Sequence, residues 1–136
     1  MAAFALTDCY VALNGTDRSA HVKQMTLQVD AATLDVTDFA DAGWTANIAG
    51  IKSGTLNLSF NQDMAASSID SILFALLGTV VTFEVRATNA AVSTSNAKYT
   101  GSVLVNGWTP LDGSVGDLAS VSVSFPLSGA VTRATA

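Results

Sequence analysis

Nucleophilic or metal chemistry in this sequence would have to rest on one thiol and one imidazole. Cys9 is the only cysteine and His21 the only histidine among the 136 residues. A lone cysteine forms no internal disulfide, and a single His without a second His or Cys falls short of a zinc ligand set. Cys9 lies in an alternating apolar stretch, which is typical of a small buried hydrophobe. We therefore expect neither His-dependent catalysis nor a zinc centre.

Carboxylates are the next candidates, because they act as general acids and bases or bind calcium. Asp35, Asp38 and Asp41 lack the Asp-x-Asp-x-Asp-Gly spacing of a calcium-binding loop, which favours a solvated acidic rim. Glu84 lies two residues from Arg86, so we interpret it as a solvent-facing side chain beside an opposite charge. No glycine-rich phosphate loop follows a predicted strand. The sequence predicts a protein that is not an enzyme and uses no cofactor or metal.

The chain is poor in charge and acidic. Six Lys and Arg stand against eleven Asp and Glu, a net charge of -5, and only 12% of the residues are charged whereas 49% are hydrophobic. Domains usually carry about 25% charged residues, so we expect neighbouring molecules to cover much of this surface. The basic residues are scattered, which argues against tight phosphate binding. No apolar run reaches the length of a membrane span, and the first residues lack the pattern of a secretory signal, so we expect synthesis in the cytoplasm and no membrane partner.

Apolar and polar residues alternate in several segments, as in strands with one buried face. Asn14-Gly15 favours a type I′ turn, which predicts a hairpin over residues 9–17. The chain length suits one domain, residues 1–136, and we expect a mainly β fold: an antiparallel β-sandwich or partial barrel. The other predicted strands are Val22–Asp30, Thr55–Phe60, Val81–Arg86, Lys98–Trp108 and Ala119–Phe125.

One segment, residues 67–78, has helical rather than strand periodicity. Its apolar residues recur at i, i+3, i+4 and i+7, and we expect this face to pack on the apolar face of the sheet. Ser67 and Asp70 resemble a capping box, and Gly78 suits the end of the helix. The residues expected to pack are Ile69, Ile72, Leu73 and Leu76.

Residues 31–54 show no persistent period and are predicted to be a long loop. Structureless loops of this length are uncommon in compact domains and are usually functional or disordered. This one is too apolar for a solvated linker, so we interpret it as an assembly arm that contacts another subunit. The residues expected to make that contact are Leu34, Phe39, Trp44 and Ile48.

The predicted strands are poorly protected at their edges. Monomeric sheets usually carry Lys, Pro or inward-pointing charges on their outer strands, and here these residues are sparse. This favours edges that pair with identical subunits, and a closed ring would remove the edges altogether.

The order of these elements resembles that of phage major tail tube proteins of long noncontractile tails, especially those of actinobacterial phages. Relatives of these tail tube proteins include the inner tubes of contractile tails. The resemblance covers nearly the whole chain and depends on the Asn14-Gly15 turn, the long segment 31–54, the sequence LNLSFNQD at 56–63, the helix that ends at Gly78, and the segment from Gly113 to Gly129.

The resemblance implies a structural virion protein that forms stacked, hexameric rings. One β-barrel built by all subunits would line the tail tube through which DNA is ejected, and tape measure and tail terminator proteins would be further partners. The residues expected to face the lumen are Gln24, Thr26, Gln28, Asp30, Thr55, Asn57, Ser59 and Glu84. The alternative is a β-sandwich binding or decoration module that displays loops to a ligand.

Overall fold

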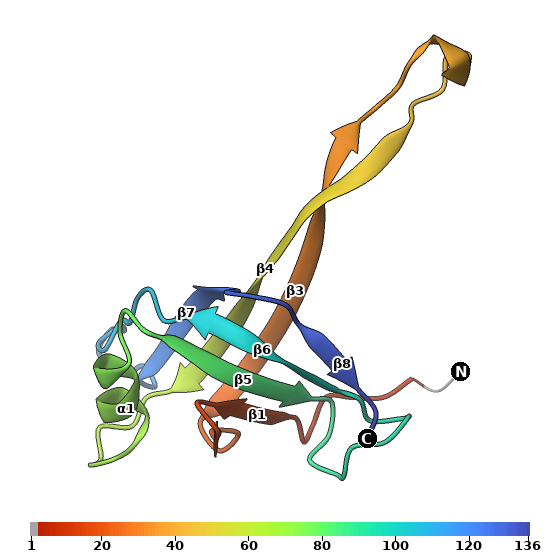
Figure 1. Ribbon diagram of the computed structural model, residues 1–136. Helices are drawn as coiled ribbons and strands as arrows, with labels where there is room; N and C mark the ends of the chain where they lie inside the picture. The colour runs from red at the N-terminus through yellow and green to blue at the C-terminus, as the bar shows by residue number, and fades with distance from the viewer. Residues whose placement is uncertain (1–2) are drawn as a thin grey trace.

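The computed structural model describes residues 3–136, which fold into two antiparallel sheets. The three-stranded sheet has the order β3-β4-β7 and the five-stranded sheet the order β2-β1-β5-β6-β8 (Figure 1). The first sheet contains β3 (Val22–Asp35), β4 (Asn47–Asn61) and β7 (Ser120–Pro126). The second contains β1 (Tyr10–Leu13), β2 (Thr16–Asp17), β5 (Val80–Arg86), β6 (Lys98–Leu104) and β8 (Thr132–Ala134). A mainly β, antiparallel fold is therefore confirmed, and over residues 3–136 of the single chain the two sheets do not close into a barrel.

The core lies between the two sheets, because the apolar side of each alternating strand faces the other sheet. Leu56, Leu58 and Phe60 of β4 are buried against Val81, Phe83 and Val85 of β5. An isolated bridge between Val103 and Leu127 joins the sheets along one side. The alternation in the sequence thus arises from burial of one face of each sheet.

The predicted turn at Asn14-Gly15 is confirmed. Both residues have positive φ, 54° and 79°, as a type I′ turn requires, and they connect β1 to β2. The strand predicted over Lys98–Trp108 is shorter than expected and ends at Leu104. Beyond it, Val105 N–H donates to Thr79 O and Val105 O accepts from Gly78 N–H, so the pairing runs only to the two residues that precede β5.

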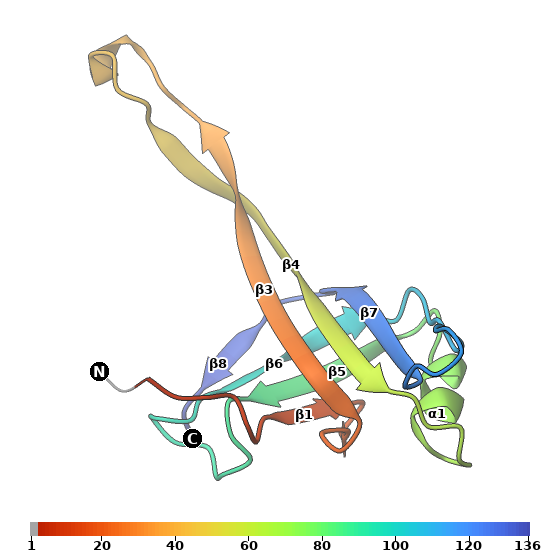
Figure 2. The ribbon, with the colours of Figure 1, turned by 180° about the vertical axis from the view of Figure 1, so that it is seen from behind.

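Residues 31–54 form a hairpin instead of the expected irregular loop. β3 and β4 pair far beyond the body of the domain, to Leu34 opposite Ile48 and Asp35 opposite Asn47, with a register shift between Ala31 and Thr33. Figures 1 and 2 show this hairpin projecting from the two sheets. Because both of its faces are exposed, its sequence has no alternation between buried and solvated positions. We call residues 31–54 the hairpin arm.

The helix α1 (Ile69–Ala75) lies at one end of the domain, beside the start of β5 (Figure 1). Ile69 and Leu73 are buried in the core, Leu76 packs against it, and Ile72 lies partly exposed at its margin. The expected cap at Ser67 is wrong: the N-cap is Ser68, and Ser67 has a φ of 59°. The hydroxyl of Ser68 donates to Asp63 over 2.7 Å, so it fixes the preceding turn.

Candidate functional site: a polar sheet face and a projecting hairpin

The three-stranded sheet carries a continuous polar surface on the side away from the core. Thr26 pairs with Asn57, which pairs with Ser124, and the next row joins Gln24, Ser59 and Ser122. We call this surface the polar face; it comprises Gln24, Thr26, Gln28, Asp30, Thr55, Asn57, Ser59, Ser122 and Ser124. Its middle is slightly hollowed, and the hydroxyls of Ser59 and Ser122 lie 3.0 Å apart there.

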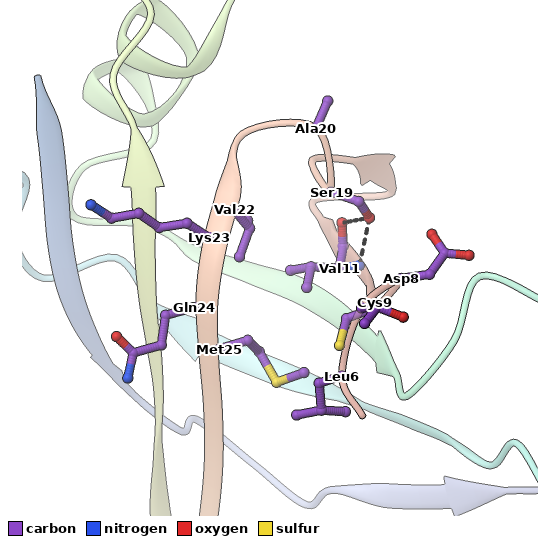
Figure 3. Close-up of a pocket in the computed structure, with 11 residues that line it drawn as sticks. Leu6, Asp8, Cys9, Val11, Ser19, Ala20, Val22, Lys23, Gln24 and Met25 are labelled. Carbon is purple, nitrogen blue, oxygen red and sulfur yellow. Dashed lines mark hydrogen bonds between the residues drawn. The ribbon is translucent and has the colours of Figure 1, made fainter. Parts of the chain in front are cut away.

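The charge of the polar face is small and negative. Asp30 is its one ionisable residue, and it accepts hydrogen bonds from the Gln28 side chain over 3.2 and 3.4 Å. Lys52 pairs with Ala31, so its side chain lies on the opposite side of the sheet. The surface is therefore hydrated and hydrogen-bonding, and a cation lies only at its margin, where Lys23, in the bulge at the start of β3, extends on the same side as Gln24 (Figure 3).

Glu84 does not belong to the polar face, contrary to the expectation from the sequence. It lies on β5 in the other sheet, opposite Ala12 of β1 and Thr100 of β6. Its Oε2 is 3.1 Å from Nε of Arg86, whose guanidinium also lies 3.9 Å from the centre of the Tyr10 ring. The expected pairing of Glu84 with Arg86 is confirmed. The expected grouping of Glu84 in one polar row with the residues of β3 and β4 is wrong, because a strand's period does not reveal the sheet to which the strand belongs.

The tip of the hairpin arm is ordered by local hydrogen bonds. Asp38 and Asp41 form a capping box around the short helix η1 (Phe39–Asp41). Thr37 closes the hairpin below it, because Ala46 N–H donates to its hydroxyl over 2.8 Å. Hydrogen bonds from the hydroxyl and the backbone of Thr37 hold the pKa of Asp35 below its ordinary value. The three acids therefore shape the tip.

The structured tip displays large apolar side chains to solvent. Phe39 is fully exposed, Trp44 is 79% exposed, and the two line one shallow cleft with Thr37, Asp38, Gly43 and Thr45. Leu34, Ile48 and Ile51 are exposed lower on the arm. Exposed apolar patches of this kind usually mark interaction sites.

The single histidine and the single cysteine have different surroundings. Nε2 of His21 is 4.0 Å from Asp63, whereas Cys9 is a free, partly buried thiol on the segment before β1. Within residues 3–136, no three His, Cys, Asp or Glu side chains gather as metal ligands. In the same part of the chain, no helix has the length and hydropathy needed to cross a bilayer.

An open sheet with one polar face, together with an arm that exposes aromatic residues, defines a subunit of an assembly. Comparison with known families identifies it: the phage tail tube protein family matches residues 13–133, so this chain belongs to that family and is a structural tail tube protein. The resemblance inferred from the sequence is therefore confirmed, and the alternative of a decoration module is not supported.

Solved structures share the fold. One, described as the virion of a native gene transfer agent particle, aligns with a TM-score of 0.77 at 19% identity over 97% of this chain and 99% of that chain. Another is described as the tail of an empty gene transfer agent particle with C6 symmetry, and it aligns with a TM-score of 0.61 at 21% identity over 84% of this chain and 82% of that chain. Comparison with curated protein sequences finds no match.

Two parts of the surface were missed as site residues by the analysis of the sequence. Ser122 and Ser124 complete the polar face; their alternation in β7 was visible, but their pairing with β4 was not. Leu111, Val115 and Leu118 form a second exposed apolar segment, in the long connection between β6 and β7. Because these three apolar residues follow no period, the sequence does not indicate whether their side chains are buried or exposed.

Proposed function

We propose that six copies of this chain form a ring whose inner wall is the polar face, and that such rings stack into the tail tube through which DNA is ejected. One observation carries the proposal: the three-stranded sheet combines a polar face with two outer strands, β3 and β7, each paired on one side only within residues 3–136. The six-fold number is supported by the C6 symmetry of the similar gene transfer agent tail.

Ring closure would satisfy the backbone groups of both outer strands. β3 and β7 are both antiparallel to β4, so they run in the same direction. A rotation about a ring axis keeps that direction, so β3 of one copy would meet β7 of the next as a parallel pair. Such a contact is heterologous and generates a ring when the rotation closes, and closure removes both edges of the three-stranded sheet.

The polar face suits the passage of DNA. Its side chains are neutral hydroxyls and amides apart from Asp30, so a polyanion would find hydration and weak repulsion there. Each added Lys or Arg would form a contact with phosphate and would slow sliding. The function is mechanical and electrostatic, and no catalytic step is part of it.

The hairpin arm is the contact between one ring and the next in this proposal. It extends away from the sheets (Figure 2), and Phe39 and Trp44 are exposed at its tip. Burial of these two aromatic side chains against another copy would stabilise the contact by about 25 cal/mol for each Å² of apolar surface. The finished tail would also need tape measure and tail terminator proteins as partners inside and at the end of the tube.

Negative-stain electron microscopy of the purified protein over a concentration series tests the proposal. Rings or tubes, with a matching shift in sedimentation, are the expected result. A single monomeric species at every concentration, even in the presence of tail-initiation components, would contradict it.

A further inference from the structure

A cavity of about 500 Å³ lies beside the first residues of β3, at the free edge of the three-stranded sheet. Its apolar wall is formed by Leu6, Val11, Val22 and Met25. Figure 3 shows Cys9 between the N-terminal segment and β3, with its sulfur on the side of Met25 and Leu6. The two sheets are bridged on their other side, at Val103 and Leu127. The cavity is thus an opening into the sandwich at the edge where a neighbouring subunit would pair.

A second feature lies beside the other free edge. The segment 111–118, which we call the apolar loop, leads into the start of β7 and exposes Leu111, Val115 and Leu118. Its apex is a defined turn: Asp117 N–H donates to Ser114 O over 3.0 Å, and the Asp117 carboxylate accepts from Ser114 N–H over the same distance. Gly116 has a φ of 91°, and Val115 is fully exposed beside it. The turn therefore presents Val115 outward.

The register of the sheet places these two features at the same level. Phe60 of β4 pairs with Val22 on one side and with Val121 on the other. The start of β3, with its cavity, and the start of β7, with the apolar loop before it, consequently lie at the same end of the sheet. A rotation that brings β7 of one copy to β3 of the next also brings the apolar loop to the cavity.

We propose that the apolar loop of one subunit fills the cavity beside β3 of the next subunit in the ring and covers Cys9. This inference rests on the proposed ring. The occupant is a second copy of this chain, because the apolar wall meets apolar side chains in continuity with the pairing of the two sheet edges. Charge does not select this occupant, because the lining includes both Asp8 and Lys23, and the Lys23 side chain extends on the side of Gln24, away from Asp8 (Figure 3). Each subunit thereby completes the core of its neighbour.

The single cysteine makes the first test possible without any mutation. A small thiol reagent such as iodoacetamide is reacted with Cys9 in free subunits and in tubes that have been isolated by sedimentation and checked by electron microscopy. We expect labelling to slow by about tenfold or more in tubes, because modification depends on access to the thiol. Equal rates in free subunits and verified tubes would overturn the proposal.

The second test identifies the occupant. In Val115→Cys, oxidation of assembled rings should link the introduced thiol to Cys9 of the adjacent subunit and give a ladder of covalent oligomers. The matched control is Val80→Cys, at an exposed valine on β5 in the other sheet, which should give no ladder. Peptide mapping of the ladder must show Cys9 joined to position 115.

The outcomes separate this proposal from the proposed function. Two results together would overturn the contact and leave the ring standing. The Val115→Cys chain would form tubes without the cross-link, and Cys9 would be as well protected in tubes of Leu118→Ser as in tubes of the unaltered chain. Leu118 is 72% exposed in the subunit, so its replacement should leave the isolated fold intact. Persistent monomers at every concentration would overturn the ring and this contact together.

Discussion

The indole Nε1 of Trp108 donates a hydrogen bond to Oδ1 of Asp70 over 3.0 Å and so joins the connection after β6 to the first turn of α1. The same ring packs edge-on against Phe60, with centroids 5.9 Å apart. One side chain thereby ties the helix, the three-stranded sheet and the connection that leads to the apolar loop. Three parts of the chain that are distant in the sequence thus meet at this end of the sandwich.

Replacement of Trp108 by Phe should destabilise the subunit by about 1 kcal/mol, because it removes this hydrogen bond and leaves most of the apolar contact. The midpoint of urea unfolding, followed by circular dichroism, measures the effect. Trp44→Phe is the matched control and should change stability by less than about 0.5 kcal/mol, since Trp44 is exposed. Equal midpoints for the two variants would contradict a structural role for Trp108.

Leu73→Ala should cost about 2–5 kcal/mol, because Leu73 is 1% exposed in the core and its truncation leaves a cavity. Phe74→Ala, at the next position on the same helix, should be nearly neutral in the subunit, since Phe74 is 63% exposed. Chemical unfolding of the monomer compares them. A neutral Leu73→Ala would mean that this face of the helix does not support the core.

Protonation of the Asp63 carboxylate should lower the stability of the subunit in acid. The Ser68 hydroxyl first, and then the Ala65 N–H, hold the pKa of Asp63 below its ordinary value of 3.8. A lowered pKa in the folded state gives stability that is present above pH 3.8 and is lost as the pH falls through the folded pKa. Asp63→Asn should therefore flatten the decline of thermal stability below pH 4.

Ser68→Ala serves as the matched variant for this effect, because it removes the principal hydrogen bond and keeps the carboxylate. An NMR titration of the Asp63 carboxyl should show its pKa rising toward 3.8. An unchanged titration would show that the hydroxyl does not set the pKa.

Removal of the arm's tip should abolish tubes and leave the subunit folded. Asp35 and Asn47 are partners at the end of the paired region, so an Asn-Gly turn in place of residues 36–46 would close a two-residue hairpin there. Sedimentation and electron microscopy measure assembly, and unfolding of the monomer reports whether the fold is retained. Normal tubes from this shortened chain would disprove the stacking role of the arm.

Fluorescence emission from Trp44 provides a second measure of the contact between the tip of the hairpin arm and another ring. It should be red-shifted in the free subunit, where the ring is exposed, and blue-shifted in tubes, with Trp108→Phe used to isolate the signal. An emission spectrum that stays red-shifted in tubes would place the tip outside any interface.

Lysines on the polar face should point into the tube. Thr26→Lys and Asn57→Lys, at directly paired positions, should leave tubes intact and slow DNA ejection, because each adds a cation along the path of the phosphates. Thr82→Lys is the control, on the exposed side of β5 in the other sheet. A bulky amine reagent that cannot enter the tube should label the introduced lysine of Thr82→Lys and not those at positions 26 and 57, and peptide mapping separates these sites from the native Lys23, Lys52 and Lys98. Labelling of Thr26→Lys in intact tubes would mean that the polar face lies outside.

The sequence by itself determined the strands that have one buried face, where α1 lies and how β1 turns into β2, whereas β8 (Thr132–Ala134) and the paired part of the hairpin arm were not predicted. Alternation along β5 and β7, the spacing of Ile69 and Leu73, and Asn14-Gly15 are local signals, because burial of one face and a positive φ impose them residue by residue. The order of these elements also indicated the family.

Only the tertiary structure decided how those elements combine. It assigned Glu84 to the sheet opposite the polar face and placed Ser122 beside Ser59. It also turned residues 31–54 into a hairpin whose pairing depends on backbone hydrogen bonds, since neither face is buried in the subunit. Strand periodicity records burial of one face, and it contains no information on strand order or on a strand solvated on both sides.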